Sequence, residues 1–192
     1  MLRVATIVAD TEAEGPGRRF AVWVQGCSLR CAGCCNPEMF DERRGTAMTA
    51  AELAAQIPAG VEGITLLGGE PFEQAAGCAE FARLAKARGL TVMVFSGYTR
   101  AELTDRSDTA ELFGEIDLLV DGRYDRTQPE PPPPTGRRWI GSANQTMHYL
   151  TTAYSAHDAR MRTSNTIEIR VSARDILING WPSAEQLLRR RR

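Results

Sequence analysis

The sequence is poor in lysine, in aromatic residues and in long apolar runs. Lys86 is its only lysine, and we interpret the arginine excess as a base-composition bias of the genome. No stretch approaches the roughly 20 apolar residues that a membrane-crossing helix requires. The first ten residues are too short and too soon acidic for a signal peptide. We therefore expect no membrane segment and a cytoplasmic location.

A surplus of either charge sign is also missing. The 24 acidic and 23 basic side chains leave a net charge of −1, and 43% of the residues are hydrophobic. This balance argues against intrinsic disorder and against bulk nucleic-acid binding. With 192 residues, the chain is long enough to bury one core without disulfide bonds.

The cysteine pattern does not form a disulfide framework. The five cysteines are odd in number, and four of them fall within the nine residues from Cys27 to Cys35. In a chain without an export signal, such a cluster more often binds metal or performs redox chemistry. The pattern indicates a reducing compartment.

Apolar segments alternate with helical patterns along most of the chain. We expect strands at 3–8, 20–24, 63–67, 90–95 and 116–120, and helices at about 49–57, 74–88 and 100–113. This alternation predicts an α/β fold with a parallel sheet and right-handed crossovers. Four or five strands are too few to close an eight-stranded barrel, so we expect an open, partial barrel.

Residues suited to chemistry follow the carboxyl ends of the predicted strands. The cysteine loop follows one strand, and residues 68–71, 96–97 and 121–122 follow the next three. Parallel α/β folds place their sites at this edge of the sheet. The sequence therefore predicts one shared site there.

The C-terminal part of the chain is less regular. Residues 128–136 contain five prolines and predict a stiff surface excursion. A strand is expected near 147–150. The alternating segments 166–171 and 176–179, separated by Ala173-Arg174-Asp175, predict a C-terminal β-hairpin. The basic end at 189–192 is expected to be frayed.

The cysteine spacing admits two kinds of metal site. Cys27, Cys31 and Cys34 stand at spacings of four and three, and three thiolates on one loop suit a 4Fe–4S cluster that keeps one iron open. A structural zinc site needs four ligands, typically in two separated pairs, and the sequence has no second pair. Zinc or a structural role remains the alternative at this point.

A second motif favours the iron–sulfur interpretation through a resemblance. Cys27-x3-Cys31-x2-Cys34 followed by Gly68-Gly69-Glu70-Pro71 resembles the radical S-adenosylmethionine (SAM) superfamily. Within it the match is closer to the small activases of glycyl radical enzymes, and closest to the anaerobic ribonucleotide reductase activases. The other segments that carry the resemblance are 15–18, 25–26, 36–37, 63–66, 96–98, 119–122 and 141–145.

The resemblance implies the cofactors and the reaction. Cys27, Cys31 and Cys34 would ligate a 4Fe–4S cluster whose open iron is chelated by the amino and carboxylate groups of SAM. One electron would then cleave SAM reductively into methionine and a 5′-deoxyadenosyl radical. A flavodoxin- or ferredoxin-type protein would donate that electron.

The resemblance also implies SAM-binding residues, each of which has a plainer alternative. The Gly-Gly-Glu-Pro segment would hold the methionine end of SAM, although a simple strand-to-helix turn uses the same residues. For the others, the alternatives are a capping hydroxyl, a surface arginine or a turn amide that bonds its own backbone. The implied residues are Gly68, Gly69, Glu70, Pro71, Ser96, Asp121, Arg123, Asn144 and Gln145.

Two features depart from the family pattern. The family often has an aromatic residue beside the last cluster cysteine, near the adenine, whereas this chain has Gly33 and Cys35 there. The chain also continues beyond Leu150, where the compact activases would end. We expect residues 1–151 to form the radical SAM partial barrel, and residues 152–192 to form an extension within the same globule.

Three functions follow as hypotheses. The leading one is an activase, whose radical abstracts a hydrogen atom from a backbone glycine of a partner glycyl radical enzyme. The alternative is a radical SAM enzyme that acts on a small molecule or peptide, such as a 7-carboxy-7-deazaguanine synthase or a natural-product maturase. The third is a non-enzymatic zinc or cysteine-redox module.

Overall fold

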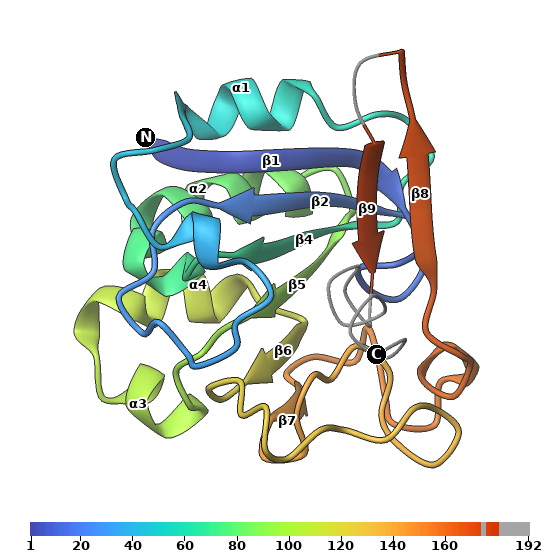
Figure 1. The fold of residues 1–192 in the computed structure, drawn as a ribbon. Helices are drawn as coiled ribbons and strands as arrows, with labels where there is room; N and C mark the ends of the chain where they lie inside the picture. Colours follow the sequence, from blue (N-terminus) through green and yellow to red (C-terminus); the bar gives the residue numbers. More distant parts are fainter. Residues whose placement is uncertain (174–175, 181–192) are drawn as a thin grey trace.

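A seven-stranded sheet forms the centre of the molecule, which we describe from a computed structural model covering residues 1–173 and 176–180 (Figure 1). The strand order is β3-β1-β2-β4-β5-β6-β7. Strands β2, β4, β5 and β6 are mutually parallel, and β1, β3 and β7 pair antiparallel at the two sides. The strand bounds are β1 Leu2–Thr11, β2 Arg19–Val24, β3 Thr46–Met48, β4 Gly63–Gly68, β5 Thr91–Phe95, β6 Leu118–Asp121 and β7 Thr146–Tyr149.

Helices connect the parallel strands, and α2 and α4 lie behind the sheet in Figure 1. The ring of Phe81 in α2 meets Phe20 of β2 at 6.2 Å between centroids, within the large core cluster on this face. No helix in the described part of the chain is long and apolar enough to cross a membrane. The helix bounds are α1 Ala50–Ala55, α2 Ala75–Lys86, α3 Arg100–Thr104 and α4 Ala110–Glu115, with 3₁₀ turns η1 Pro37–Met39, η2 Pro71–Gln74, η3 Ser107–Thr109 and η4 Ala159–Met161.

The expected α/β class with a block of parallel strands is confirmed, whereas a barrel is not. The first strand pairs antiparallel with β2, because the short loop 12–18 is long enough for a reversal but not for a crossover. A short strand that the sequence pattern did not predict, β3, pairs with β1. Among the described residues the sheet has two open edges, at β3 and β7.

Other expected elements differ mainly at their ends. Helix α1 has the predicted capping box, in which Thr49 and Glu52 exchange hydrogen bonds, but it ends at Ala55 instead of residue 57. The helical region expected at 100–113 consists of α3, η3 and α4. The strand expected near 147–150 is β7, which pairs with β6.

The predicted C-terminal hairpin is confirmed as β8 Ile167–Val171 paired with β9 Ile176–Gly180. In Figure 1 it crosses in front of the sheet, on the face opposite α2. The predicted turn includes residues 174–175, and the predicted basic end comprises 189–192; both lie outside the described residues.

A fully buried arginine lies at the amino-terminal end of the parallel strands. Arg19 donates to the hydroxyls of Thr65 (3.1 Å), Thr91 (2.7 Å) and Tyr154 (2.9 Å), and also to the carbonyl oxygen of Ile64. Burial lowers the pKa of its guanidinium. Because Tyr154 belongs to the segment after β7, this network ties that segment to the sheet.

Candidate metal and cofactor site

A cavity of about 740 Å³ lies where the parallel strands end. It gathers residues from four loops, those after β2, β4, β5 and β6, which is the edge at which the sequence predicted a shared site. Eight of the sequence-predicted site residues line it: Cys27, Cys31, Cys34, Gly68, Gly69, Glu70, Ser96 and Gln145.

Four predicted site residues do not line this cavity. Pro71 is buried as the first residue of η2. Asp121 accepts a hydrogen bond from the Arg100 backbone N–H and lies 3.1 Å from His148 Nε2. Arg123 pairs with both carboxylate oxygens of Glu102, at 2.9 and 3.0 Å. Asn144 donates its amide to the Arg123 carbonyl oxygen at 2.8 Å.

The cysteine loop begins at Gly26, where the backbone adopts a left-handed conformation that favours glycine. Gly26 has φ +98°, and its N–H donates to the Met39 carbonyl oxygen at 2.8 Å. The Gln25 side chain donates to the carbonyl oxygens of Glu38 (3.2 Å) and Asp41 (2.8 Å), which fastens the loop's return segment. The Cys34 N–H closes a turn onto the Cys31 carbonyl oxygen at 3.1 Å. The protein itself therefore holds both ends of the loop.

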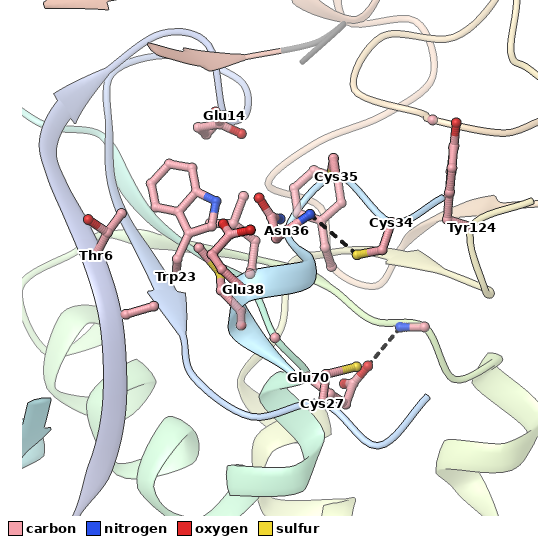
Figure 2. A pocket seen from close by; sticks show the side chains of 18 of the residues that line it. Thr6, Glu14, Trp23, Cys27, Cys34, Cys35, Asn36, Glu38, Glu70 and Tyr124 are labelled. Carbon is pink, nitrogen blue, oxygen red and sulfur yellow. Dashed lines mark hydrogen bonds between the residues drawn. The ribbon is translucent and has the colours of Figure 1, made fainter. Parts of the chain in front are cut away.

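The four loop cysteines are free thiols with different surroundings. Burial raises the pKa of Cys27 and of Cys31. A hydrogen bond from Cys35 lowers the pKa of Cys34 to about 7, and the same bond raises the pKa of Cys35. The Asn36 N–H also donates to Cys34 Sγ at 3.4 Å (Figure 2). Cys34 is thus the loop thiol that ionises most easily.

The thiols do not converge on a single point. Among residues 1–173 and 176–180, no group of three or more His, Cys, Asp or Glu side chains is placed to hold one metal ion. A tetrahedral zinc site requires such convergence, whereas a 4Fe–4S cubane takes each thiolate at a different iron.

The glycine pair after β4 packs against the cysteine loop. A Cβ at Gly68 would lie 2.7 Å from Trp23 Cβ, and its φ of +98° also favours glycine. A Cβ at Gly69 would collide with the Gly26 carbonyl oxygen. Backbone bonds Gly69 N–H to Val24 O and Glu70 N–H to Gly26 O, both 2.8 Å, join the two loops. Side chains at these two positions would push the loops apart, so this stretch of the cavity wall is formed by backbone.

Glu70 is a buried carboxyl that joins three loops. One oxygen accepts from Phe72 N–H (3.0 Å) and Ser96 Oγ (2.9 Å), and the other accepts from Gly97 N–H (2.8 Å; Figure 2). Burial raises the pKa of Glu70 to about 7. Figure 2 shows Cys27 beside this carboxyl. Ser96 therefore reaches the cavity as a partner of Glu70, and it also caps locally by accepting from Tyr98 N–H at 3.0 Å.

Gln145 closes the cavity wall on the β6 side. Its side-chain oxygen accepts from the backbone of Gly141 (3.0 Å) and Ser142 (3.1 Å), and its Nε2 donates to Gly122 O at 3.0 Å. Arg137 donates to the Gln145 carbonyl oxygen at 2.6 Å. The turn-amide behaviour considered from the sequence is therefore present, and it fixes the loop after β6.

Several lining residues were missed by the sequence reasoning. Trp23 belongs to a strand that was expected to be wholly buried. Because side chains alternate along a strand, Trp23 faces the side of the sheet opposite Val22 and Val24, and this alternation could have placed it at the cavity. Glu14 lies just before the 15–18 segment, and burial raises its pKa to about 7. Asn179 reaches the cavity from the hairpin, and no local signal could have placed it there.

Comparisons with known proteins agree with this site. The family model described as a 4Fe-4S single cluster domain matches residues 13–148. An anaerobic ribonucleoside-triphosphate reductase-activating protein of Vibrio cholerae is 32% identical over 148 residues, which cover 71% of this chain and 91% of that protein. Its counterpart in Enterobacteria phage T4 is 29% identical over 152 residues, covering 75% and 92%.

A second kind of relative matches a shorter segment. A pyruvate formate-lyase-activating enzyme of Listeria monocytogenes is 35% identical over 101 residues, which cover 49% of this chain and 41% of that enzyme. The family model covers the cysteine loop, the glycine pair and the loop after β6. This chain therefore belongs to the 4Fe-4S single cluster domain family and is a radical SAM protein of the activating type.

Proposed function

We propose that this chain is the activase of a glycyl radical enzyme, of the kind that activates an anaerobic ribonucleotide reductase. Its cofactors are a 4Fe–4S cluster and SAM. The observation that carries the proposal is the meeting of three thiols with the Gly-Gly-Glu segment in one cavity. We assign Cys27, Cys31 and Cys34 as the cluster ligands, which leaves one iron for SAM.

The residues of the cavity fit these two groups. The cysteine loop offers three free thiols without a disulfide bond. Gly68 and Gly69 line the cavity, and their lack of side chains lets the loop after β4 pack directly against the cysteine loop. When bound, the cofactor pair supplies a 5′-deoxyadenosyl radical by one-electron cleavage of SAM. Glu70 and Ser96 would hold in place the loops that line the SAM site, and apolar lining residues such as Trp23 would exclude water.

We assign lesser roles to the predicted residues outside the cavity. Three of these residues position the loop after β6. Asp121 accepts from the Arg100 backbone N–H, and Arg123 pairs with Glu102. Asn144 donates to the Arg123 carbonyl oxygen. Pro71 sets the start of η2 below Glu70. Gln145 then supplies the cavity wall that these residues hold in place.

We further propose that strands β1–β7 form the open, partial barrel of the radical SAM type. On this proposal residues 1–151 are the catalytic domain, and residues 152–192 are an extension within the same globule. The Arg19–Tyr154 bond and the bonds between the hairpin and residues 10–14 support a single globule. A cytoplasmic location and a flavodoxin- or ferredoxin-type electron donor belong to the same proposal.

The charge of the cavity favours a peptide substrate over an acidic small molecule. The charged side chains that line it within the described residues are Glu14, Glu38, Glu70 and Arg44. An anionic substrate, as for a 7-carboxy-7-deazaguanine synthase, would meet the carboxylate of Glu38, together with Glu14 and Glu70 in their ionised forms, against the single guanidinium of Arg44. A neutral backbone segment that carries a glycine meets no such repulsion.

The test uses a cluster-ligand variant and a matched cysteine control. Cys31→Ala is expected to reduce the iron bound after anaerobic reconstitution and to abolish 5′-deoxyadenosine formation from SAM with dithionite. Cys78→Ala, in the buried face of α2, is the control and keeps both. Undiminished 5′-deoxyadenosine from Cys31→Ala would refute the ligand assignment.

A second measurement tests the substrate class. Electron paramagnetic resonance of the wild-type protein, SAM and the anaerobic reductase from the same genome should show a glycyl radical. SAM cleavage without that radical, but with turnover of a small molecule, would favour the alternative function.

A further inference from the structure

The hairpin β8–β9 turns an apolar face toward solvent. Ile169 pairs directly with Ile178, and Val171 with Ile176, so the four side chains share one face. Their exposed fractions are 63% for Ile169, 73% for Val171, 66% for Ile176 and 40% for Ile178. We call these four residues the outer apolar face. Among the described residues, the other exposed large apolar side chains are Met1 and Leu84.

The opposite face of the hairpin is fastened to residues 10–14 by polar bonds. Glu168 accepts from Glu12 N–H at 2.7 Å, and Arg170 donates to the Asp10 carbonyl oxygen. Asn179 Nδ2 donates to Thr11 Oγ1 at 2.9 Å. Gly180 N–H likewise donates to the carboxyl of Glu14, at 2.7 Å. The outer apolar face could turn inward only by breaking these bonds, so residues 1–173 and 176–180 leave it exposed.

The outer apolar face is continuous with the cavity. Leu177 packs against the cluster that contains Trp23, and Leu177, Ile178 and Asn179 all line the cavity. Ile178, which lies between Leu177 and Asn179 on the opposite side of the strand, is also a lining residue, so β9 forms part of the rim of the cavity. A protein that inserts a segment into the cavity past β9 would approach this face.

The size of the face distinguishes between possible occupants. The two strands have five residues each. With a rise of about 3.3 Å per residue and a spacing of about 4.8 Å between strands, the hairpin presents a surface of roughly 16 by 10 Å. A stable dimer needs about 800 Å² from each copy. A second copy of this chain would find too little area here. A partner that also fills the cavity gains the remaining contact inside it.

We propose that the outer apolar face docks the partner protein whose glycine-bearing segment enters the cavity. The partner meets it with an uncharged, apolar patch beside that segment. The hairpin lies beyond residues 13–148 matched by the family model, so this surface is an addition to the family domain. The inference rests on the proposed function and names the surface through which it recognises its partner.

The test removes apolar contact area from the outer apolar face while keeping residues that favour a β-strand. The double variant Ile169→Thr/Val171→Thr keeps β-branched side chains but removes apolar contact. The partner in the assay is the anaerobic reductase encoded in the same genome. We expect the KM of the double variant for this reductase in glycyl-radical formation to be at least tenfold higher than that of wild type, with kcat unchanged. SAM cleavage without the reductase should equal that of wild type. Leu84→Gln, on α2, is the matched control and leaves the KM unchanged.

The outcomes separate this inference from the proposed function. Wild-type protein that cleaves SAM and forms the glycyl radical, together with an unchanged KM in the double variant, overturns the docking surface alone. A wild-type dimer that the double variant dissociates in sedimentation also overturns it, because the face would then join two copies. Wild-type protein that forms no glycyl radical overturns both. Ile176→Thr, on the other strand, repeats the measurement should the double variant fail to fold.

Discussion

Single glycines decide how closely the loops around the cavity approach one another. Gly68 has φ +98°, and a Cβ there would lie 2.7 Å from Trp23 Cβ. Gly89, at the end of α2, has φ +77° with no heavy atom within 4 Å of such a Cβ. The two positions therefore share the backbone strain of a left-handed residue but differ in steric contact.

This difference gives a prediction with an internal control. Gly68→Ala should lower the free energy of unfolding by about 2–4 kcal/mol, from backbone strain plus overpacking. Gly89→Ala should lose only about 1–2 kcal/mol, from strain alone. Urea unfolding of both variants measures the difference. Equal losses would mean that Trp23 yields to the added methyl group.

A buried carboxyl makes stability depend on pH. Burial raises the pKa of Glu14 to about 7, from 4.5, against the hydrogen bonds from Asn179 and Gly180. The folded state therefore holds a proton that the unfolded chain has released. The contribution of this group is fully present below pH 4.5 and is lost as the pH rises to about 7.

We expect this loss to reach about 3 kcal/mol in the wild-type protein. Glu14→Gln keeps an oxygen for the same two donors but cannot ionise, so its free energy of unfolding should change less across this range. Denaturant unfolding at several pH values measures both proteins, with the exposed Glu80→Gln as the control. A Glu14→Gln curve parallel to wild type would contradict the assignment.

At the scale of elements, short helices depend on their caps. Helices α1 and α3 have six and five residues, and both begin with a threonine–glutamate capping box. In α3 the same glutamate, Glu102, also pairs with Arg123, which holds the loop after β6. Cap and loop are thus joined through one carboxylate.

Removing a cap should therefore have a local cost. Thr99→Ala is expected to lower the free energy of unfolding by about 1 kcal/mol. Thr99→Ser retains a capping hydroxyl and should therefore retain most of the wild-type stability. Thermal unfolding of the two variants is the measurement. The alanine variant would contradict this account if it were as stable as the serine variant.

The sequence predicted elements better than it predicted their long-range partners. The strands before Cys27, Gly68, Ser96 and Asp121 follow from local apolar runs, and their shared edge follows from parallel pairing. The buried carboxyl of Glu14 accepts a hydrogen bond from Asn179, which lies 165 positions away in the sequence, and no local pattern predicts that bond. The open, partial barrel stays a proposal, because the strand count and strand order alone do not say how far the sheet curves.

At the scale of the molecule, the segment after β7 is joined to the sheet through Arg19. Tyr154→Phe removes the hydroxyl that accepts from this guanidinium and lies 2.6 Å from Thr91 Oγ1. Leaving a buried charge short of one partner should lower the free energy of unfolding by about 1–3 kcal/mol. Far-UV circular dichroism and tryptophan fluorescence should still follow one shared transition. Two separate transitions would mean that residues 152–192 unfold on their own.

The Arg19 network lies at the amino-terminal end of the parallel strands, whereas the cysteine loop and the glycine pair lie at their carboxyl ends. Substitutions that adapt the protein to a hotter or colder habitat can accumulate around Thr91 and Tyr154 without replacing a residue of the cysteine loop or of the glycine pair. Evolution, or an engineer, can therefore adjust heat tolerance at one end of the sheet while the radical chemistry at the other is inherited intact.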